Sequence, residues 1–115
     1  MTSSEEVCEV VITAPNASWL ADFTDSLVKD RLAACGHNIA TIRSIYRWRG
    51  VIHDEHEARV ALHTRRALIP AINKRLDAQH PYEVPCLIAL PIVGGSAAYI
   101  QWIIEETASP ESLRL

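Results

Sequence analysis

Residues 57–64 read Glu-Ala-Arg-Val-Ala-Leu-His-Thr, an alternation of side chains that decides how the chain folds. In an extended strand, successive side chains point to opposite faces. One face therefore carries the apolar groups of Ala58, Val60 and Leu62. The opposite face carries Glu57, Arg59, Ala61 and His63. This pattern predicts an antiparallel sheet that packs helices on one face and leaves a partly polar second face.

A second strand precedes this one. Residues 39–48 are rich in Ile, Thr, Tyr and Trp, which are typical of strands. Gly50 and the charged residues 53–56 lie between the two strands. The sequence therefore predicts a long hairpin with residues 53–56 at its tip.

The N-terminal part of the chain predicts a strand followed by a helix. Residues 7–13 are β-branched and short, as in a strand buried on both faces. Asn16 is a suitable cap for a helix that runs to about Ala34, with Gly36 as its terminator. The apolar positions of this helix recur at spacings of three and four: Leu20, Phe23, Leu27, Val28 and Leu32.

The C-terminal part predicts a helix, a strand and a final helix. Pro70 fits best in a first helical turn, so this helix should begin near residues 67–69. Prolines mark residues 80–85 as a loop, and residues 86–92 read as a strand. The final helix follows Gly94-Gly95. The resulting order is that of an α+β, ferredoxin-like split β-α-β sandwich with an added C-terminal helix. We expect one domain over residues 1–115, with its core at about 7–107 and polar tails at both ends.

Composition excludes several classes of function. The net charge of −3 does not suit nucleic acid or anionic lipid, which require clustered Lys and Arg. No apolar stretch approaches the roughly 20 residues of a membrane span, and the N-terminus resembles no secretion signal. The cysteines, Cys8, Cys35 and Cys86, are odd in number and widely spaced, which favours a reducing, cytoplasmic location.

Three motifs together carry a family resemblance. They are Arg-Leu-Ala-Ala-Cys at 31–35, Ser-Ile-Tyr-Arg-Trp at 44–48 followed by Gly50, and His-Pro-Tyr-Glu-Val-Pro at 80–85. In their order and spacing the chain resembles the CutA divalent-cation-tolerance family from about Val10 to Thr107. The resemblance implies a homotrimer with an architecture similar to the PII nitrogen-signalling proteins, and no established enzymatic activity.

The resemblance also implies a function. Bacterial members are associated with tolerance of divalent cations, especially copper, so we expect a homotrimer that binds metal or a small ligand at inter-subunit clefts. No cofactor is required on this interpretation. Two alternatives stay open: a structural scaffold without an intrinsic ligand, and an unrecognised small-molecule enzyme. Acylphosphatases share the split β-α-β order, but the loop at 13–16 lacks the Arg that they need.

Several residues depart from the family pattern near the expected cleft. Cys86 stands where the family usually carries Glu, His63 where it carries Lys, and His37 where Asn is common. We predict that His80 and Cys86 bind Cu or Zn weakly, because imidazole and thiolate suit these metals. The alternative is that His80 hydrogen-bonds a carbonyl to fix its loop and that Cys86 packs as an apolar residue. Further ligand-cleft candidates are His63, Tyr82 and Glu83.

Other candidates have simpler interpretations. His53 and His56 form either a second ligand cluster or a solvated hairpin tip. Cys35 continues the phase of the first helix and reads as a core residue. Tyr46 and Trp48 on a ferredoxin-like sheet invite comparison with RNA-recognition domains. Those domains stack bases on aromatic residues of their third strand, and residues 57–64 contain none. We therefore expect Tyr46 and Trp48 at a subunit interface, where aromatic residues are enriched.

Overall fold

The structure is a computed structural model that describes residues 6–109. Its elements are β1 (Val7–Ala14), α1 (Ala17–Lys29), β2 (Cys35–Trp48), β3 (Val51–Arg65), the 3-10 turn η2 (Arg66–Leu68), α2 (Ile69–Gln79), β4 (Leu87–Pro91) and α3 (Ala97–Glu106). The predicted order and the ferredoxin-like α+β class are confirmed. Pro70 lies in the first turn of α2, as expected. Most of the predicted polar tails, residues 1–5 and 110–115, lie outside the described residues.

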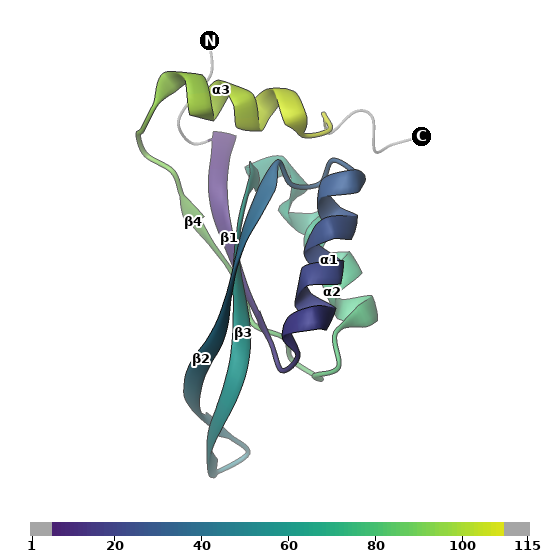
Figure 1. The fold of residues 1–115 in the computed structure, drawn as a ribbon, viewed down its shortest axis with the longest axis vertical. Helices are drawn as coiled ribbons and strands as arrows, with labels where there is room; N and C mark the ends of the chain where they lie inside the picture. The colour runs from purple at the N-terminus through teal and green to yellow at the C-terminus, as the bar shows by residue number, and fades with distance from the viewer. Residues whose placement is uncertain (1–5, 110–115) are drawn as a thin grey trace.

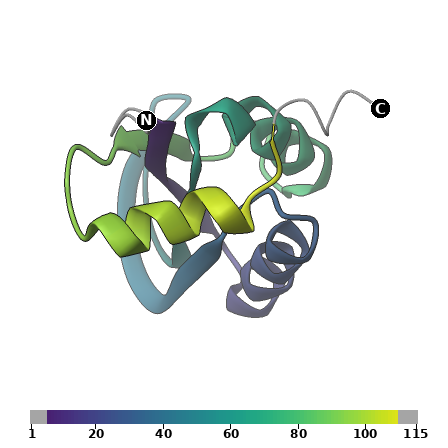
Figure 2. The ribbon, with the colours of Figure 1, turned by 90° about the horizontal axis from the view of Figure 1, so that it is seen from above.

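The four strands form one sheet in the order β2-β3-β1-β4, and every neighbouring pair is antiparallel. Helices α1 and α2 cover one face of the sheet, whereas α3 crosses its end (Figure 1). The view from above shows α3 lying across the ends of the strands (Figure 2). We call the face opposite α1 and α2 the open face.

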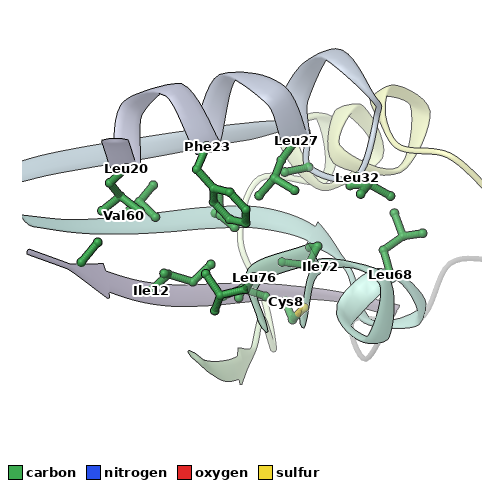
Figure 3. Close-up of a cluster of buried hydrophobic side chains, with 14 of the residues drawn as sticks. Cys8, Ile12, Leu20, Phe23, Leu27, Leu32, Val60, Leu68, Ile72 and Leu76 are labelled. Carbon is green, nitrogen blue, oxygen red and sulfur yellow. The ribbon is translucent and has the colours of Figure 1, made fainter. Parts of the chain in front are cut away.

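The core lies between the sheet and the two covering helices, as Figure 3 shows. Val60 and Leu62 are fully buried there, so the predicted apolar face of residues 57–64 is confirmed. Leu20 and Leu27 of α1 meet this face together with Ile72 of α2. Burying each such side chain contributes about 1.5–3 kcal/mol, so the alternation fixes which face receives the helices.

Helix α1 begins as predicted but ends earlier. The Asn16 side chain accepts a hydrogen bond from the Trp19 N–H at 2.9 Å, which caps the first turn. The helix ends at Lys29, not near Ala34, because Arg31 adopts a left-handed conformation with φ 60°. The Arg31 guanidinium donates to the Glu105 carbonyl oxygen at 2.6 Å, which ties this turn to the C-terminus of α3.

Gly36 does not terminate a helix but lies within β2, directly beneath α1. A β-carbon at this position would come within 2.4 Å of Cγ2 of Thr24 and within 3.0 Å of Cδ2 of Leu62. The side chain of Thr24 is buried and donates to the Leu20 carbonyl. Glycine is therefore required here because α1 packs directly against the strand backbone.

The hairpin is longer than predicted. Its tip is Arg49-Gly50, where both residues have positive φ, 50° and 80°. Two-residue hairpin turns adopt positive φ because this backbone matches the right-handed twist of the flanking strands. Residues 53–56 belong to β3 and do not form the tip. Ala40 and Thr41 form part of β2, which has a bulge between Ala40 and Ile42.

No helix among residues 6–109 is long and apolar enough to cross a membrane.

Strand β4 begins at Leu87, one residue later than expected.

Candidate functional site

The strand register places a row of polar side chains across the open face. Cys35 of β2 is paired with His63 of β3, and His63 is paired in turn with Glu9 of β1. His37 lies two residues beyond Cys35 on the same strand, so it points to the same face. Residues far apart in the sequence are thus brought together by pairing alone.

These side chains contact one another directly. The Cys35 Sγ lies 3.7 Å from the His63 Nδ1. The other ring nitrogen of His63, Nε2, lies 3.0 Å from Oε1 of Glu9. A carboxylate accepts only, so Nε2 of His63 donates to Glu9, and in the neutral ring Nδ1 is the acceptor. The rings of His37 and His63 meet edge to face, with 5.3 Å between their centroids.

Helix α3 adds an aromatic side chain to this group. The Tyr99 hydroxyl donates to the His63 Nδ1 at 2.5 Å and lies 3.3 Å from the Cys35 Sγ. Burial, reinforced by the contact with Cys35, raises the pKa of Tyr99 to about 12, so its phenol stays protonated at neutral pH. We call Cys35, His37 and His63, with Glu9 and Tyr99 around them, the Cys/His cluster.

The cluster corrects one prediction. Cys35 is not a core residue at the end of a helix: it begins β2 and is only half-buried. His63, a predicted ligand-cleft candidate, contacts Glu9 of β1 and Tyr99 of α3 within the chain. The sequence interpretation missed Glu9 and Tyr99 altogether.

The remaining predicted residues gather in a second place, a groove of about 840 Å³ between the hairpin and the loop that follows α2. Tyr82, Glu83 and Cys86 line it from the loop, and Tyr46 and Trp48 line it from β2. Two of the predicted cleft residues, Tyr82 and Glu83, thus share one surface with the predicted interface aromatics. Cys86 is exposed in the single chain.

The floor of the groove is held by tyrosine–carboxylate hydrogen bonds. The Tyr82 hydroxyl donates to the buried Glu57 carboxylate at 3.1 Å. Burial, followed by this bond to Glu57, raises the pKa of Tyr82 above its usual range. Tyr46 makes a similar bond to Glu55 at 3.0 Å. The groove is therefore a polar-floored depression with aromatic and apolar walls.

Replacing Tyr82 with Phe should destabilise the folded chain by about 1–2 kcal/mol, because the buried Glu57 carboxylate loses a donor. Chemical denaturation at a fixed protein concentration measures this change. The matched control is Tyr46→Phe, whose partner Glu55 is exposed and can bond water instead. Equal losses in both variants would show that burial of the carboxylate is not what matters.

His80 lies next to the groove residue Tyr82, and both of its ring nitrogens are hydrogen-bonded. Its Nε2 donates to the Thr13 carbonyl oxygen at 2.9 Å, and its Nδ1 accepts from the Tyr82 N–H at 3.0 Å. The side chain is buried and meets the Trp19 ring edge to face. This arrangement matches the alternative in which His80 fixes its loop. A metal could bind His80 only by displacing one of these two backbone groups.

These features define an α+β ferredoxin-like domain with an appended helix, an open sheet face and two polar sites on it. Residues 8–106 match the model of the family described as CutA1 divalent ion tolerance protein. The chain belongs to this family.

Relatives and solved structures agree with this assignment. The divalent-cation tolerance protein CutA of Thermus thermophilus is 38% identical over 103 residues, covering 90% of this chain and 98% of that protein. The human Protein CutA is 37% identical, covering 90% of this chain but 58% of its own length. Among solved structures, CutA1 of Oryza sativa has a TM-score of 0.87 at 32% identity, covering 93% of this chain and 99% of that one.

The chain spans little more than half of some curated relatives. It covers 59% of the chloroplastic Protein CutA of Arabidopsis thaliana, to which it is 36% identical over 107 residues, a stretch that is 91% of this chain.

Proposed function

We propose that the protein is a homotrimeric binding module that takes up a divalent metal ion or a small ligand at clefts between its subunits, and so contributes to metal tolerance. Family membership supports the metal, because the matching family is described by divalent ion tolerance. Copper is the metal to test first, because thiol and imidazole groups line the candidate sites.

The observation that carries the trimer is the apolar character of exposed strands. Ile39 on β2 is 52% exposed, and Ile88 and Leu90 on β4 are 53% and 47% exposed. By register, all three side chains lie on the open face, which neither α1 nor α2 covers. Exposed apolar side chains on both edge strands favour an interaction surface, and both edges need covering.

Light scattering at low micromolar concentration tests this assembly. We expect a mass three times that of the single chain. A monomeric or dimeric mass would remove the inter-subunit clefts, and with them the proposed function.

Replacing Trp48 with Ala should weaken assembly by about 2 kcal/mol, since truncating an interface aromatic commonly has this effect. Trp48 is 38% exposed in the chain, and the Arg49 guanidinium lies 5.2 Å from its ring. Dilution followed by light scattering should show smaller species for the variant only. If the variant stays trimeric on dilution with an unchanged melting temperature, Trp48 is a local packing residue.

A catalytic role is the less favoured alternative, because the family description names tolerance and not a reaction. A scaffold without an intrinsic ligand is the other alternative, and calorimetric titration with metal separates it from a binding module.

We further propose a reducing location such as the cytoplasm. The free thiols of Cys8, Cys35 and Cys86 support it. One relative is a chloroplastic Protein CutA and one solved structure is of a periplasmic CutA, so the family occurs in more than one compartment. The location of this protein is therefore tested directly.

The predicted pair His80 and Cys86 is retained as one candidate for the metal ligands. Cys86 is exposed and available. Binding at His80 would need a change in the loop, because both ring nitrogens already serve backbone groups. Affinity at this pair should therefore be weak.

A further inference from the structure

We propose that Cys35, His37 and His63 form a binding site for one borderline-soft divalent transition metal, with Zn(II) as the representative ion. This inference rests on the proposed function, because it assigns the metal ion of the proposed binding module to these three residues. Among residues 6–109, these three side chains are the group whose ligand atoms all lie within 4.8 Å of one another.

The spacing of the ligand atoms is close to what a tetrahedral ion requires. Zinc bonds of about 2.3 Å to sulfur and 2.1 Å to nitrogen hold these two atoms about 3.6 Å apart. The Cys35 Sγ and the His63 Nδ1 are already 3.7 Å apart. The His37 side chain is exposed in the single chain, and its ring already lies edge to face against that of His63. Metal binding must therefore displace the Tyr99 hydroxyl from the His63 Nδ1, while the spacing of sulfur and nitrogen can stay as it is.

Glu9 provides the support that a metal-binding histidine normally has. A ligating histidine usually donates its second ring N–H to a carboxylate, which fixes its tautomer and orientation. His63 makes this bond from Nε2 to Glu9 at 3.0 Å, while Nδ1 faces Cys35. Nδ1 is thus turned toward Cys35, and the Tyr99 hydroxyl that donates to it must move aside when an ion binds.

The types of ligand select the metal. One thiolate and two imidazoles suit Zn(II), Co(II) and copper, whereas Mg(II) and Ca(II) prefer oxygen. The register distributes the ligands over β2 and β3, so the site rests on paired strands and not on a flexible loop. The fourth position stays open to water. Tyr99 contributes hydrogen bonds to the cluster but no nitrogen or sulfur ligand.

Titration of the full chain with Co(II) tests the site directly. Binding through Cys35 should produce a sulfur-to-cobalt charge-transfer band and the visible bands of tetrahedral cobalt, with one ion per chain. Zn(II) should abolish both by displacement. Cys35→Ser should remove the charge-transfer band, and His37→Gln and His63→Gln should each weaken binding about 100-fold.

Supporting residues and controls make the assignment specific. Glu9→Gln should weaken binding about tenfold, since it removes the orienting carboxylate and no ligand. Tyr99→Phe should keep the charge-transfer band. The control His56→Gln, at an exposed histidine of β3, should bind Co(II) as the parent does. Cys86→Ser and His80→Gln report on the weaker candidate pair in the groove, and thermal melting confirms that each variant is folded. His37→Gln changes an exposed side chain, so it serves as the test if a change at Cys35 impairs folding.

Two results would overturn the proposal. One is the absence of any Co(II) spectrum with the parent protein at micromolar concentration. The other is a spectrum that survives in Cys35→Ser and His37→Gln but disappears in Cys86→Ser or His80→Gln, which would place the metal in the groove. Neither result affects the mass measured by light scattering, so failure of this site is distinguishable from failure of the proposed trimer.

Discussion

Replacing Gly36 with Ala should lower the free energy of unfolding by about 3 kcal/mol. The added methyl group would lie 2.4 Å from Cγ2 of Thr24, far inside van der Waals contact. Thr24 cannot turn away easily, because it is buried, β-branched and bonded to the Leu20 carbonyl. The strand and α1 must therefore separate, which costs about 1–3 kcal/mol in an overpacked core and more where several contacts loosen together.

Gly94→Ala is the matched control for this experiment. A β-carbon at Gly94 would meet no atom within 4 Å, so the substitution should change stability by less than about 0.5 kcal/mol. Both variants are unfolded with denaturant at the same protein concentration, because the stability of an oligomer depends on concentration. Similar small effects in the two variants would mean that the α1–β2 contact adjusts without strain.

The sequence was most informative where one physical rule acted alone. The alternation at 57–64 predicted the buried face correctly because an error of one residue would expose Val60 and Leu62 and bury charge. The end of α1 was harder to predict. Leu32 and Ala33 continue the apolar spacing of the helix, but they lie after its end at Lys29. They are apolar because the turn that contains them is buried. Spacing reports burial there and not helical structure.

The hairpin tip shows a second limit. Residues 53–56 are charged, which suggested a loop, but they belong to β3 and pair with β2. Arg43 forms an ion pair with Asp54, and Tyr46 stacks on His53 with 5.0 Å between centroids. Gly50, with positive φ, was the better signal for the turn.

The candidate sites were predictable to different degrees. The groove residues Tyr46, Trp48 and Tyr82 were found because they belong to motifs that can be read along the chain. The Cys/His cluster was not found, because Cys35 and His63 are neighbours only once the strands are in register. A register derived from the tight turn at Arg49-Gly50 and the bulge near Thr41 would have brought them together.

Replacing His80 with Ala should lower the free energy of unfolding by about 3 kcal/mol while leaving Co(II) binding unchanged. The imidazole bridges the Thr13 carbonyl and the Tyr82 N–H, and both lose their partner in the variant. An unpaired buried polar group costs about 1–3 kcal/mol. The variant also loses ring packing against Trp19, whose centroid is 5.3 Å away. Denaturant unfolding and cobalt titration of the same samples measure the two effects.

Two further variants separate a structural His80 from a metal ligand. His80→Gln offers an amide that can serve one of the two backbone groups, so it should recover part of the lost stability. His56→Ala changes an exposed histidine on β3 and should be nearly neutral. If His80→Ala keeps its stability but loses metal, the imidazole is a ligand after all. The hydrogen bonds to Thr13 and Tyr82 would then be contacts that the ion displaces, and the loop would have to move when metal binds.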